Sequence, residues 1–145
     1  MSLVENRKAK FNYEILETFE GGLELLGPEV KSLRAGQASL EGSHLIVRGG
    51  EVYLTGATIA PYQPKNQPLY DPARNRRVLI TKQELKTLIG KEKTQRLTLV
   101  PLSVYNKGRF LKLKFALVRG KKQGDKRETI KKRDVERDLR RSLKE

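Results

Sequence analysis

The chain contains no cysteine and only one histidine among its 145 residues. Without cysteine there is no disulfide, no thiolate metal site and no cysteine nucleophile, which fits a reducing compartment. Catalysis or metal binding by histidine requires further oriented groups, so we expect the lone His44 to be structural. The sequence also lacks a His/Asp/Glu metal spacing and a Walker-type glycine loop. We therefore predict no catalytic residue, no metal and no cofactor.

Long apolar runs are missing as well. No stretch of about 18 apolar residues occurs, and the opening MSLVENRKAK lacks the apolar segment of a signal peptide. We therefore expect a cytoplasmic protein with no membrane partner. The length fits one domain with a modest core, and an apolar content of 37% is expected if part of the chain is unpacked.

Acidic residues are absent from residues 93–124, which hold nine lysines and arginines. Residues 11–60 hold seven acids and only three bases, so an acidic side and a basic side are expected within a net charge of +14. Because repulsion among like charges opposes folding, stability is a poor explanation for nine uncompensated bases. Binding to a phosphate backbone explains them better. This pattern favours nucleic-acid binding over a merely solvated basic face.

Alternating apolar residues predict a series of strands. Residues 11–20 and 21–27 read as a hairpin joined near Gly21-Gly22, and 43–49 and 51–60 as strands separated by Gly49-Gly50. Residues 96–105 and 109–118 flank Asn106-Lys107-Gly108 and predict a long hairpin. In its second arm the inward side would carry Leu111, Leu113, Phe115 and Leu117, and the opposite side Lys112 and Lys114.

Two short helices and one irregular loop are expected among the strands. The first helix spans 28–36, with Pro28 at its first position and Gly36 at its end. The second spans 81–91, with a Thr81/Glu84 capping box and Gly90 as its stop. Residues 61–72 hold four of the six prolines and form the loop. The fold class is therefore mainly β, a small antiparallel barrel with little helix.

The chain divides into a basic N-terminal arm (1–10), a barrel (11–118) and a basic tail (119–145). The tail holds twelve bases and six acids, and a capping box at Asp125 and Glu128 could begin a third helix. Its large apolar residues form only a thin stripe: Ile130, Val135, Leu139 and Leu143. A helix that buries so little is marginal in water, so we expect disorder when free and helix in a partner.

Stacking on unpaired bases requires exposed aromatic rings, and most of the nine Phe and Tyr fall on alternating strand positions. Tyr62 and Tyr70, in the proline-rich loop, are the better stacking candidates. Without a surface cluster of aromatics, the sequence favours recognition of shape and phosphates in a folded RNA over the reading of single bases.

Several motifs together point to a known family: GPEVKSLRAG, DPARNRRVLITKQEL, RGKKQGDKRETIKKRD, ENRKAKFNYEILETFEGG and LTLVPLSVY. With these segments nearly the whole chain resembles the family of SsrA-binding protein, also called small protein B. The resemblance implies a barrel related to the oligonucleotide-binding fold, monomeric when free, with a tail that is unstructured in solution. It implies binding to the tRNA-like end of transfer-messenger RNA (tmRNA). It further implies that the protein delivers this RNA to stalled ribosomes for trans-translation. The ribosome would be its second partner, with the tail in the empty mRNA channel near the decoding centre.

The resemblance also implies which residues face RNA: Asn6, Arg7, Glu20, Leu79, Lys112 and Lys114. The basic residues and Asn6 would contact phosphate and sugar, and Leu79 would pack on an exposed base unless it is a core residue. Glu20 would accept hydrogen bonds from base edges or 2′-hydroxyls, unless it is a solvated turn residue. We add Arg74 and Arg76, which together with Arg77 otherwise form an exposed loop flank. At the decoding centre the resemblance places Gly120, Lys121, Lys122, Asp125, Lys126 and Arg127.

Two other functions remain open from the residues. The runner-up is a ribosomal protein or general RNA chaperone, with a barrel and a basic tail neutralised by permanent RNA packing. An enzyme acting on RNA would require an acid/base or metal constellation, which the sequence does not offer.

Overall fold

The computed structural model describes residues 2–95 and 97–120. Its helices are α1 (Arg7–Asn12), α2 (Gly27–Arg34) and α3 (Lys82–Gln95), with a short 3₁₀ turn, η1 (Pro64–Asn66). Its strands are β1 (Ser2–Glu5), β2 (Tyr13–Leu23), β3 (Ala38–Ser39), β4 (His44–Arg48), β5 (Glu51–Thr55), β6 (Thr58–Ile59), β7 (Arg76–Leu79), β8 (Thr98–Lys107) and β9 (Phe110–Gly120).

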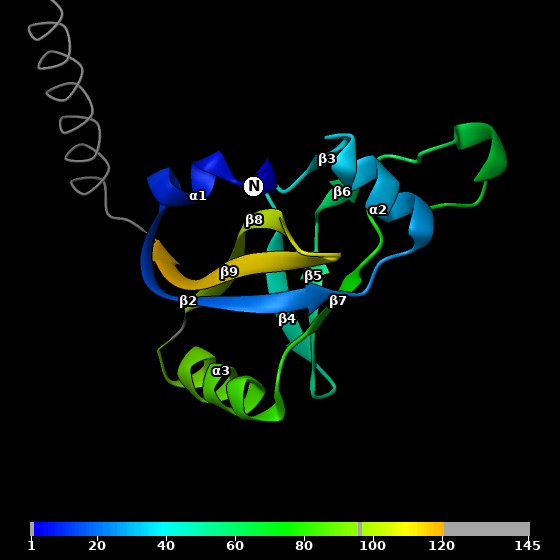
Figure 1. Cartoon of the computed structure of the whole chain (residues 1–145). Helices are drawn as coiled ribbons and strands as arrows, with labels where there is room; N and C mark the ends of the chain where they lie inside the picture. The colour runs from blue at the N-terminus through cyan, green and yellow to red at the C-terminus, as the bar shows by residue number, and fades with distance from the viewer. Residues whose placement is uncertain (1, 96, 121–145) are drawn as a thin grey trace, which may run out of the picture.

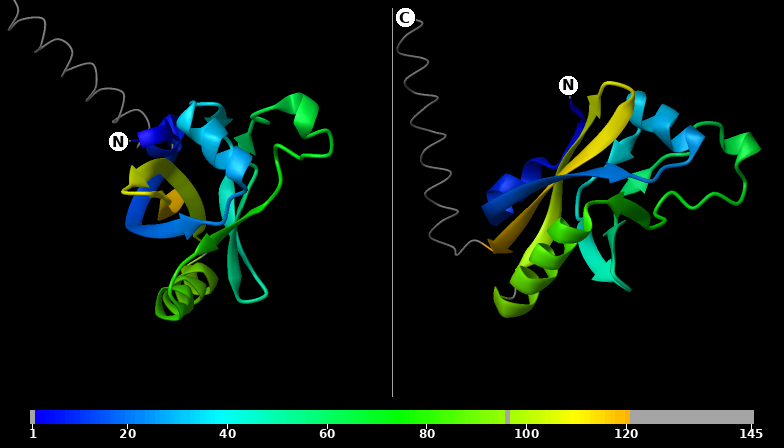
Figure 2. Two further views of the ribbon diagram at one scale, coloured as in Figure 1. Left: turned by 45° about the vertical axis from the view of Figure 1, so that its right-hand side comes forward. Right: turned by 60° about the horizontal axis from the view of Figure 1, so that its bottom comes forward.

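Six antiparallel strands close into a ring in the order β8-β4-β5-β7-β2-β9, because β9 pairs back with β8. Strand β1 adds to the edge of β8, and β3 pairs with β6 as a separate two-stranded sheet. The left view of Figure 2 shows the strands curving around a common centre. Closure removes unpaired strand edges, and it confirms the predicted small antiparallel barrel.

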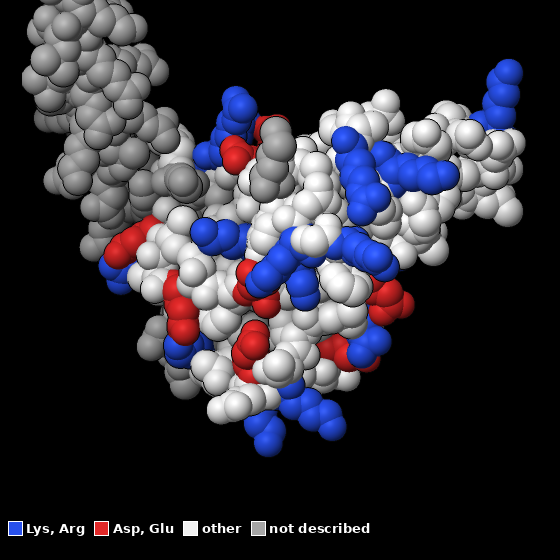
Figure 3. All heavy atoms as spheres, in the orientation of Figure 1, with Lys and Arg blue, Asp and Glu red and all other residues white. Residues whose placement is uncertain are grey.

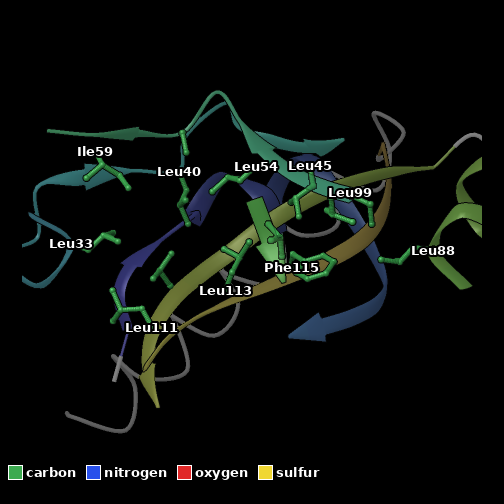
Figure 4. Packing of buried hydrophobic residues seen from close by; sticks show 14 of the residues in the cluster. Leu33, Leu40, Leu45, Leu54, Ile59, Leu88, Leu99, Leu111, Leu113 and Phe115 are labelled. Atoms are coloured by element: carbon green, nitrogen blue, oxygen red, sulfur yellow. The ribbon is translucent and has the colours of Figure 1, made fainter. Parts of the chain in front are cut away.

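Helices cover the two ends of the barrel. Leu88 of α3 and Leu33 of α2 are both buried in the same apolar cluster as the inward residues of β9, Leu113 and Phe115. Figure 4 shows these leucines at opposite ends of the packed row. The Phe115 ring stacks on Phe19 of β2, with centroids 5.5 Å apart. As predicted, the inward side of β9 is apolar from Leu111 to Leu117.

The glycine-rich turns behave as their sequences indicate. Gly49 and Gly50 join β4 to β5 with φ values of 60° and 77°, and Gly108 joins β8 to β9 with a φ of 63°. Residues other than glycine rarely adopt such φ values, which explains why glycine occupies these three turn positions. The long β8–β9 hairpin and the turn at Gly49-Gly50 are therefore confirmed. The single strand expected over 51–60 is instead divided into β5 and β6, which belong to different sheets.

The hairpin expected at Gly21-Gly22 is wrong. Strand β2 runs through both glycines, pairing first with β9 and then, at Gly22 and Leu23, with β7. A Cβ on Gly21 would lie 2.8 Å from Val78 Cγ1 and 3.1 Å from the Leu79 carbonyl oxygen. Glycine is used here for close approach between strands, and not for a turn.

The N-terminal residues pack on the barrel. Strand β1 pairs with β8, and Ala9 of α1 is buried against Val100, Ala116 and Val118 on the outer side of β8 and β9. Phe11 and Asn12, expected to begin a strand, belong to α1 instead. A helix of six residues is shorter than two turns and carries too little periodicity to be recognised from sequence.

The two longer helices fall where predicted. Helix α2 has Pro28 in its first turn and ends before Gly36, whose φ is 74°. In α3 the Glu84 N–H donates to Thr81 Oγ1 over 3.2 Å, as the capping box requires. Gly90 does not stop α3, which continues to Gln95. An isolated glycine in a helix costs only about 1 kcal/mol, which neighbouring turns offset.

The irregular loop predicted over 61–72 is present and extends to residue 75, where β7 follows; it contains η1 and projects from the body beside α2 (Figure 1). Among the described residues, no helix has the length and apolar character needed to cross a membrane. The same residues include no group of three His, Asp or Glu placed to hold a metal ion. The helix expected from Asp125 onward lies outside the described residues.

Candidate nucleic-acid interface

The outer side of β9 presents a row of large side chains to solvent. Phe110, Lys112 and Lys114 alternate with the buried residues Leu111 and Leu113. Successive members of the row are about 6.6 Å apart, because a strand rises about 3.3 Å per residue. We call this row, with Glu20 and Gly22 of β2 and the residues Ser103, Tyr105 and Lys107 of β8, the β9 face. In Figure 3 the Lys and Arg side chains gather across the middle of the molecule over β9 and along α2.

Glu20 lies inside β2, directly opposite Lys114, so it is not a turn residue. Its carboxylate accepts hydrogen bonds from the Tyr105 hydroxyl and from Lys107 Nζ, the latter over 3.0 Å. These two contacts lower the pKa of Glu20, while desolvation and the neighbouring carboxylate raise the pKa of Tyr105 to about 12. Glu20 is therefore an ionised, oriented acceptor in the middle of a cationic face.

A polar cleft of about 510 Å³ lies at one end of the β9 face and brings together three predicted RNA-facing residues, Asn6, Arg7 and Lys114. The Asn6 side-chain amide donates to the Pro101 carbonyl over 2.9 Å, and its backbone N–H donates to Leu102 over 2.8 Å. Asn6 thus fixes the start of α1 against β8. Arg7 and Lys114 are both exposed, and they present their charges to the same space.

A second cleft, of about 410 Å³, lies at the other end of the β9 face, beside the turn between β8 and β9. Leu79 and Lys112, both predicted to face RNA, lie in its wall together with Phe110. Leu79 is 47% exposed and is not a core residue. The predicted residues Asn6, Arg7, Glu20, Leu79, Lys112 and Lys114 therefore border one continuous surface.

The prediction that Arg76 faces RNA is wrong, because Arg76 lies in the interior of the molecule. Its side chain is fully buried, and its guanidinium donates to Glu29 Oε2 through Nε over 2.9 Å and through Nη2 over 2.7 Å. It also donates to the carbonyls of Ala57 and Pro72, so no part of it remains for RNA. Arg74 binds the other side of the same carboxylate and is partly exposed.

The Glu29 network ties α2 to the 61–75 loop. Tyr70, proposed above as a stacking residue, donates its hydroxyl to Glu29 Oε2 over 2.9 Å and receives a hydrogen bond from Arg76. Burial by itself raises the pKa of Glu29, but hydrogen bonds from Arg74, Leu26, Arg76 and Tyr70 lower it to about 2. Tyr62 is exposed, with Lys31 Nζ 5.4 Å from its ring centroid.

The acidic and basic parts of the chain are interleaved, which differs from the separate sides expected. Strand β2 pairs with β9, and its carboxylates reach bases on neighbouring elements: Glu14 with Arg119 over 2.7 Å, Glu17 with Lys91, and Glu20 with Lys107. The bases of 93–124 are therefore partly compensated. In contrast, Lys112, Lys114 and Arg109 form no ion pair with a carboxylate in the described part of the chain.

Sequence reasoning missed Tyr105, Lys107, Arg109 and Phe110 on this surface. All four lie in or beside the turn that joins β8 to β9, and their position next to this turn is the signal in the sequence that could have identified them. Of the predicted decoding-centre residues, Gly120 is the exposed last residue of β9, opposite Tyr13. Lys121, Lys122, Asp125, Lys126 and Arg127 lie outside the described residues.

A small closed barrel with a cationic outer face and clefts at both ends defines a barrel-type nucleic-acid-binding protein. The chain belongs to a particular family of that class, because residues 3–145 match the family described as SmpB protein. It is 46% identical to the SsrA-binding protein of Trichormus variabilis over 143 residues, which are 98% of this chain and 92% of that protein. With the SsrA-binding protein of Synechococcus elongatus the identity is 49%, over 98% and 93% of the two chains.

A solved structure is also similar. The chain resembles a chain from the structure entitled "tmRNA-SmpB: a journey to the center of the bacterial ribosome", with a TM-score of 0.68 and 45% identity. The match covers 87% of this chain and 92% of that chain. The fold is therefore shared over most of the chain.

Proposed function

We propose that this protein binds the tRNA-like domain of tmRNA and delivers it to stalled ribosomes for trans-translation. The observation that carries the proposal is the β9 face in a member of the SmpB family. One surface carries an oriented carboxylate, two flanking clefts and two lysines that form no ion pair with a carboxylate of the described residues. The names of the similar proteins, SsrA-binding protein and a tmRNA-SmpB complex on the bacterial ribosome, support the choice of RNA and partner.

In this proposal the protein acts by binding alone, as a cytoplasmic non-enzyme. The β9 face grips the folded RNA through phosphate contacts from Arg7, Lys112 and Lys114, while Glu20 accepts hydrogen bonds that phosphate cannot provide. The basic tail that follows β9, residues 121–145, enters the empty mRNA channel, where rRNA phosphate neutralises its net charge of +5. Full-length mRNA would occupy the same space and exclude the tail, so the protein reports a vacant channel.

Competition binding tests this proposal. Labelled tRNA-like domain of the tmRNA from the same cell is titrated with the protein at several salt concentrations, with random RNA duplex as competitor. We expect the tRNA-like RNA to be preferred at moderate salt, because shape-specific contacts remain when counterion release is weakened. Equal affinity for both RNAs would favour the runner-up, a general RNA chaperone or ribosomal protein.

A further inference from the structure

Glu20 and Lys114 are direct cross-strand neighbours on the β9 face, yet they form no ion pair with each other. The Cβ atoms of residues in such positions are about 4.5–5.5 Å apart, and opposite charges there attract. The Glu20 carboxylate instead binds Lys107 Nζ, over 3.0 Å, although Lys107 lies on β8, beyond β9. Another contact must therefore hold the carboxylate away from its nearest cation.

The side chain that makes this contact is Tyr105. It lies on β8 opposite Lys112, and its neighbour Val104 is buried in the core, so alternation along the strand turns Tyr105 to the outer side. The Tyr105 hydroxyl donates to the Glu20 carboxylate, and this hydrogen bond is the largest cause of the lowered pKa of Glu20. Because β9 lies between β8 and β2, the two side chains meet above β9. The carboxylate therefore points toward Lys112 and the β8–β9 turn, away from Lys114.

The ion pair with Lys107 is too weak to hold the carboxylate by itself. Its two side chains are 65% and 41% exposed, and ion pairs in such surroundings contribute little. A hydrogen bond from a hydroxyl to a charged acceptor is directional and stronger than one between neutral groups. Without it, the Glu20 carboxylate would turn to Lys114, which lies opposite. Lys114 borders the 510 Å³ cleft together with Arg7, so a captured Lys114 would be lost to a phosphate there.

We propose that Tyr105 is a positioning residue for RNA binding: its hydroxyl holds the Glu20 carboxylate away from Lys114 and keeps the Lys114 ammonium available for a phosphate. The inference rests on the proposed function and deepens it, because a neutral residue then decides how many cations the β9 face presents. The same hydrogen bond fixes the direction of the carboxylate. Glu20 therefore stays in a cationic face without neutralising the lysine beside it.

The signature of this role is a neutral substitution that changes the salt dependence of RNA binding. Tyr105→Phe removes one hydroxyl, keeps the ring and leaves the net charge unchanged. The Glu20 carboxylate then pairs with Lys114, and the slope of log K against log salt should fall by about 0.7 to 0.9, the contribution of one phosphate. Affinity should fall about two- to fivefold, the range that surface ion pairs span. A tyrosine that only supported the fold would not change the slope.

The test uses the full chain and the transcribed tRNA-like RNA, with affinity measured over a salt series for wild type, Tyr105→Phe, Glu20→Gln and the double variant. In the Glu20→Gln background no carboxylate is left to capture Lys114. Adding Tyr105→Phe to that background should therefore change neither slope nor affinity. The matched control is Tyr53→Phe, which should bind as wild type does. The Tyr53 hydroxyl also donates to a glutamate, Glu51, over 2.6 Å, but from β5, the strand opposite β9 in the ring.

The outcomes separate this proposal from the one on which it rests. An unchanged salt slope for Tyr105→Phe would overturn it. An equal fall of the slope in the Glu20→Gln background would overturn it as well, because Tyr105 would then act without the carboxylate. Binding to tmRNA is judged separately, by the preference of wild type for the tRNA-like RNA over random duplex. If that preference is absent, the proposed function fails, while salt slopes measured on either RNA still decide the role of Tyr105.

Discussion

The Arg76 guanidinium and the Glu29 carboxylate form an ion pair, Nη2 to Oε2 over 2.7 Å, in which neither side chain has any exposed surface. Together they join strand β7 to helix α2 and, through Tyr70 and Arg74, hold the 61–75 loop. A buried charge stripped of its partner is costly. Glu29→Gln should therefore lower the free energy of unfolding by about 3–5 kcal/mol, measured by denaturant titration. Glu24→Gln, which alters only an exposed pair with Arg77, should change it by less than about 1 kcal/mol.

The same carboxylate makes stability depend on acid pH. Its pKa is lowered from 4.5 to about 2 in the folded chain, so the folded state holds its proton less tightly than the unfolded state. The stabilisation is therefore complete above pH 4.5 and is lost as the pH falls toward 2. Denaturant titrations between pH 7 and pH 2.5 should show a steeper loss for wild type than for Glu29→Gln. Parallel curves for the two proteins would contradict this assignment.

Two glycines should respond to alanine in opposite directions. At Gly21 the added Cβ would meet Val78 Cγ1 at 2.8 Å and the Leu79 carbonyl at 3.1 Å, so Gly21→Ala should destabilise by about 1–3 kcal/mol. At Gly90, within α3, nothing lies within 4 Å of the added methyl group. Gly90→Ala should stabilise by about 0.5–1 kcal/mol by restricting the unfolded chain. Thermal unfolding of both variants measures the difference, and shifts of equal sign would be inconsistent with it.

A comparison of the glycine pairs Gly49-Gly50 and Gly21-Gly22 shows which turns could be predicted from the sequence and which could not. Gly49, Gly50 and Gly108 lie between alternating runs and adopt positive φ, so the local pattern was sufficient to predict the turn between β4 and β5 and the long β8–β9 hairpin. Gly21-Gly22 has the same local pattern, yet its cause is the passage of β7 alongside β2, which lies more than 50 residues away in the sequence. No local signal contains that information.

The candidate site shows the same division. Lys112 and Lys114 were placed correctly on the outer side of the last strand, because alternation alone sets that side. Arg76 alternates in the same way but faces inward, since the buried Glu29 lies there to receive it. Whether a strand arginine meets RNA or a buried carboxylate depends on which helix covers its side of the sheet, and this is a tertiary property.

Glu20 and Lys114 lie opposite each other and should affect RNA binding in different ways. Lys114→Ala should weaken binding to every RNA and reduce the salt slope by about 0.7 to 0.9. Glu20→Ala removes a negative charge from a cationic face, and charge alone would make binding tighter. If Glu20 accepts hydrogen bonds from base edges or 2′-hydroxyls, the variant should instead bind the tRNA-like RNA more weakly and random duplex no more weakly. Gel shifts over a salt series distinguish the phosphate contact of Lys114 from the hydrogen bonds accepted by Glu20, with Lys82→Ala on α3 as the control.

The division of labour between barrel and tail can be tested by truncation, and the structure decides where to cut. Strand β9 pairs with β2 as far as Gly120, opposite Tyr13, and Arg119 binds Glu14. A deletion from residue 119 would therefore disturb the barrel, whereas deletion of residues 121–145 leaves every described strand pair in place.

We expect the shorter chain to fold and to bind the tRNA-like RNA with nearly unchanged affinity, because the β9 face is intact. Peptide tagging on stalled ribosomes should be abolished, because the basic residues proposed to enter the mRNA channel are gone. Retained tagging would exclude the tail from the sensing step, and a large loss of RNA affinity would show that the tail shares the grip with the barrel.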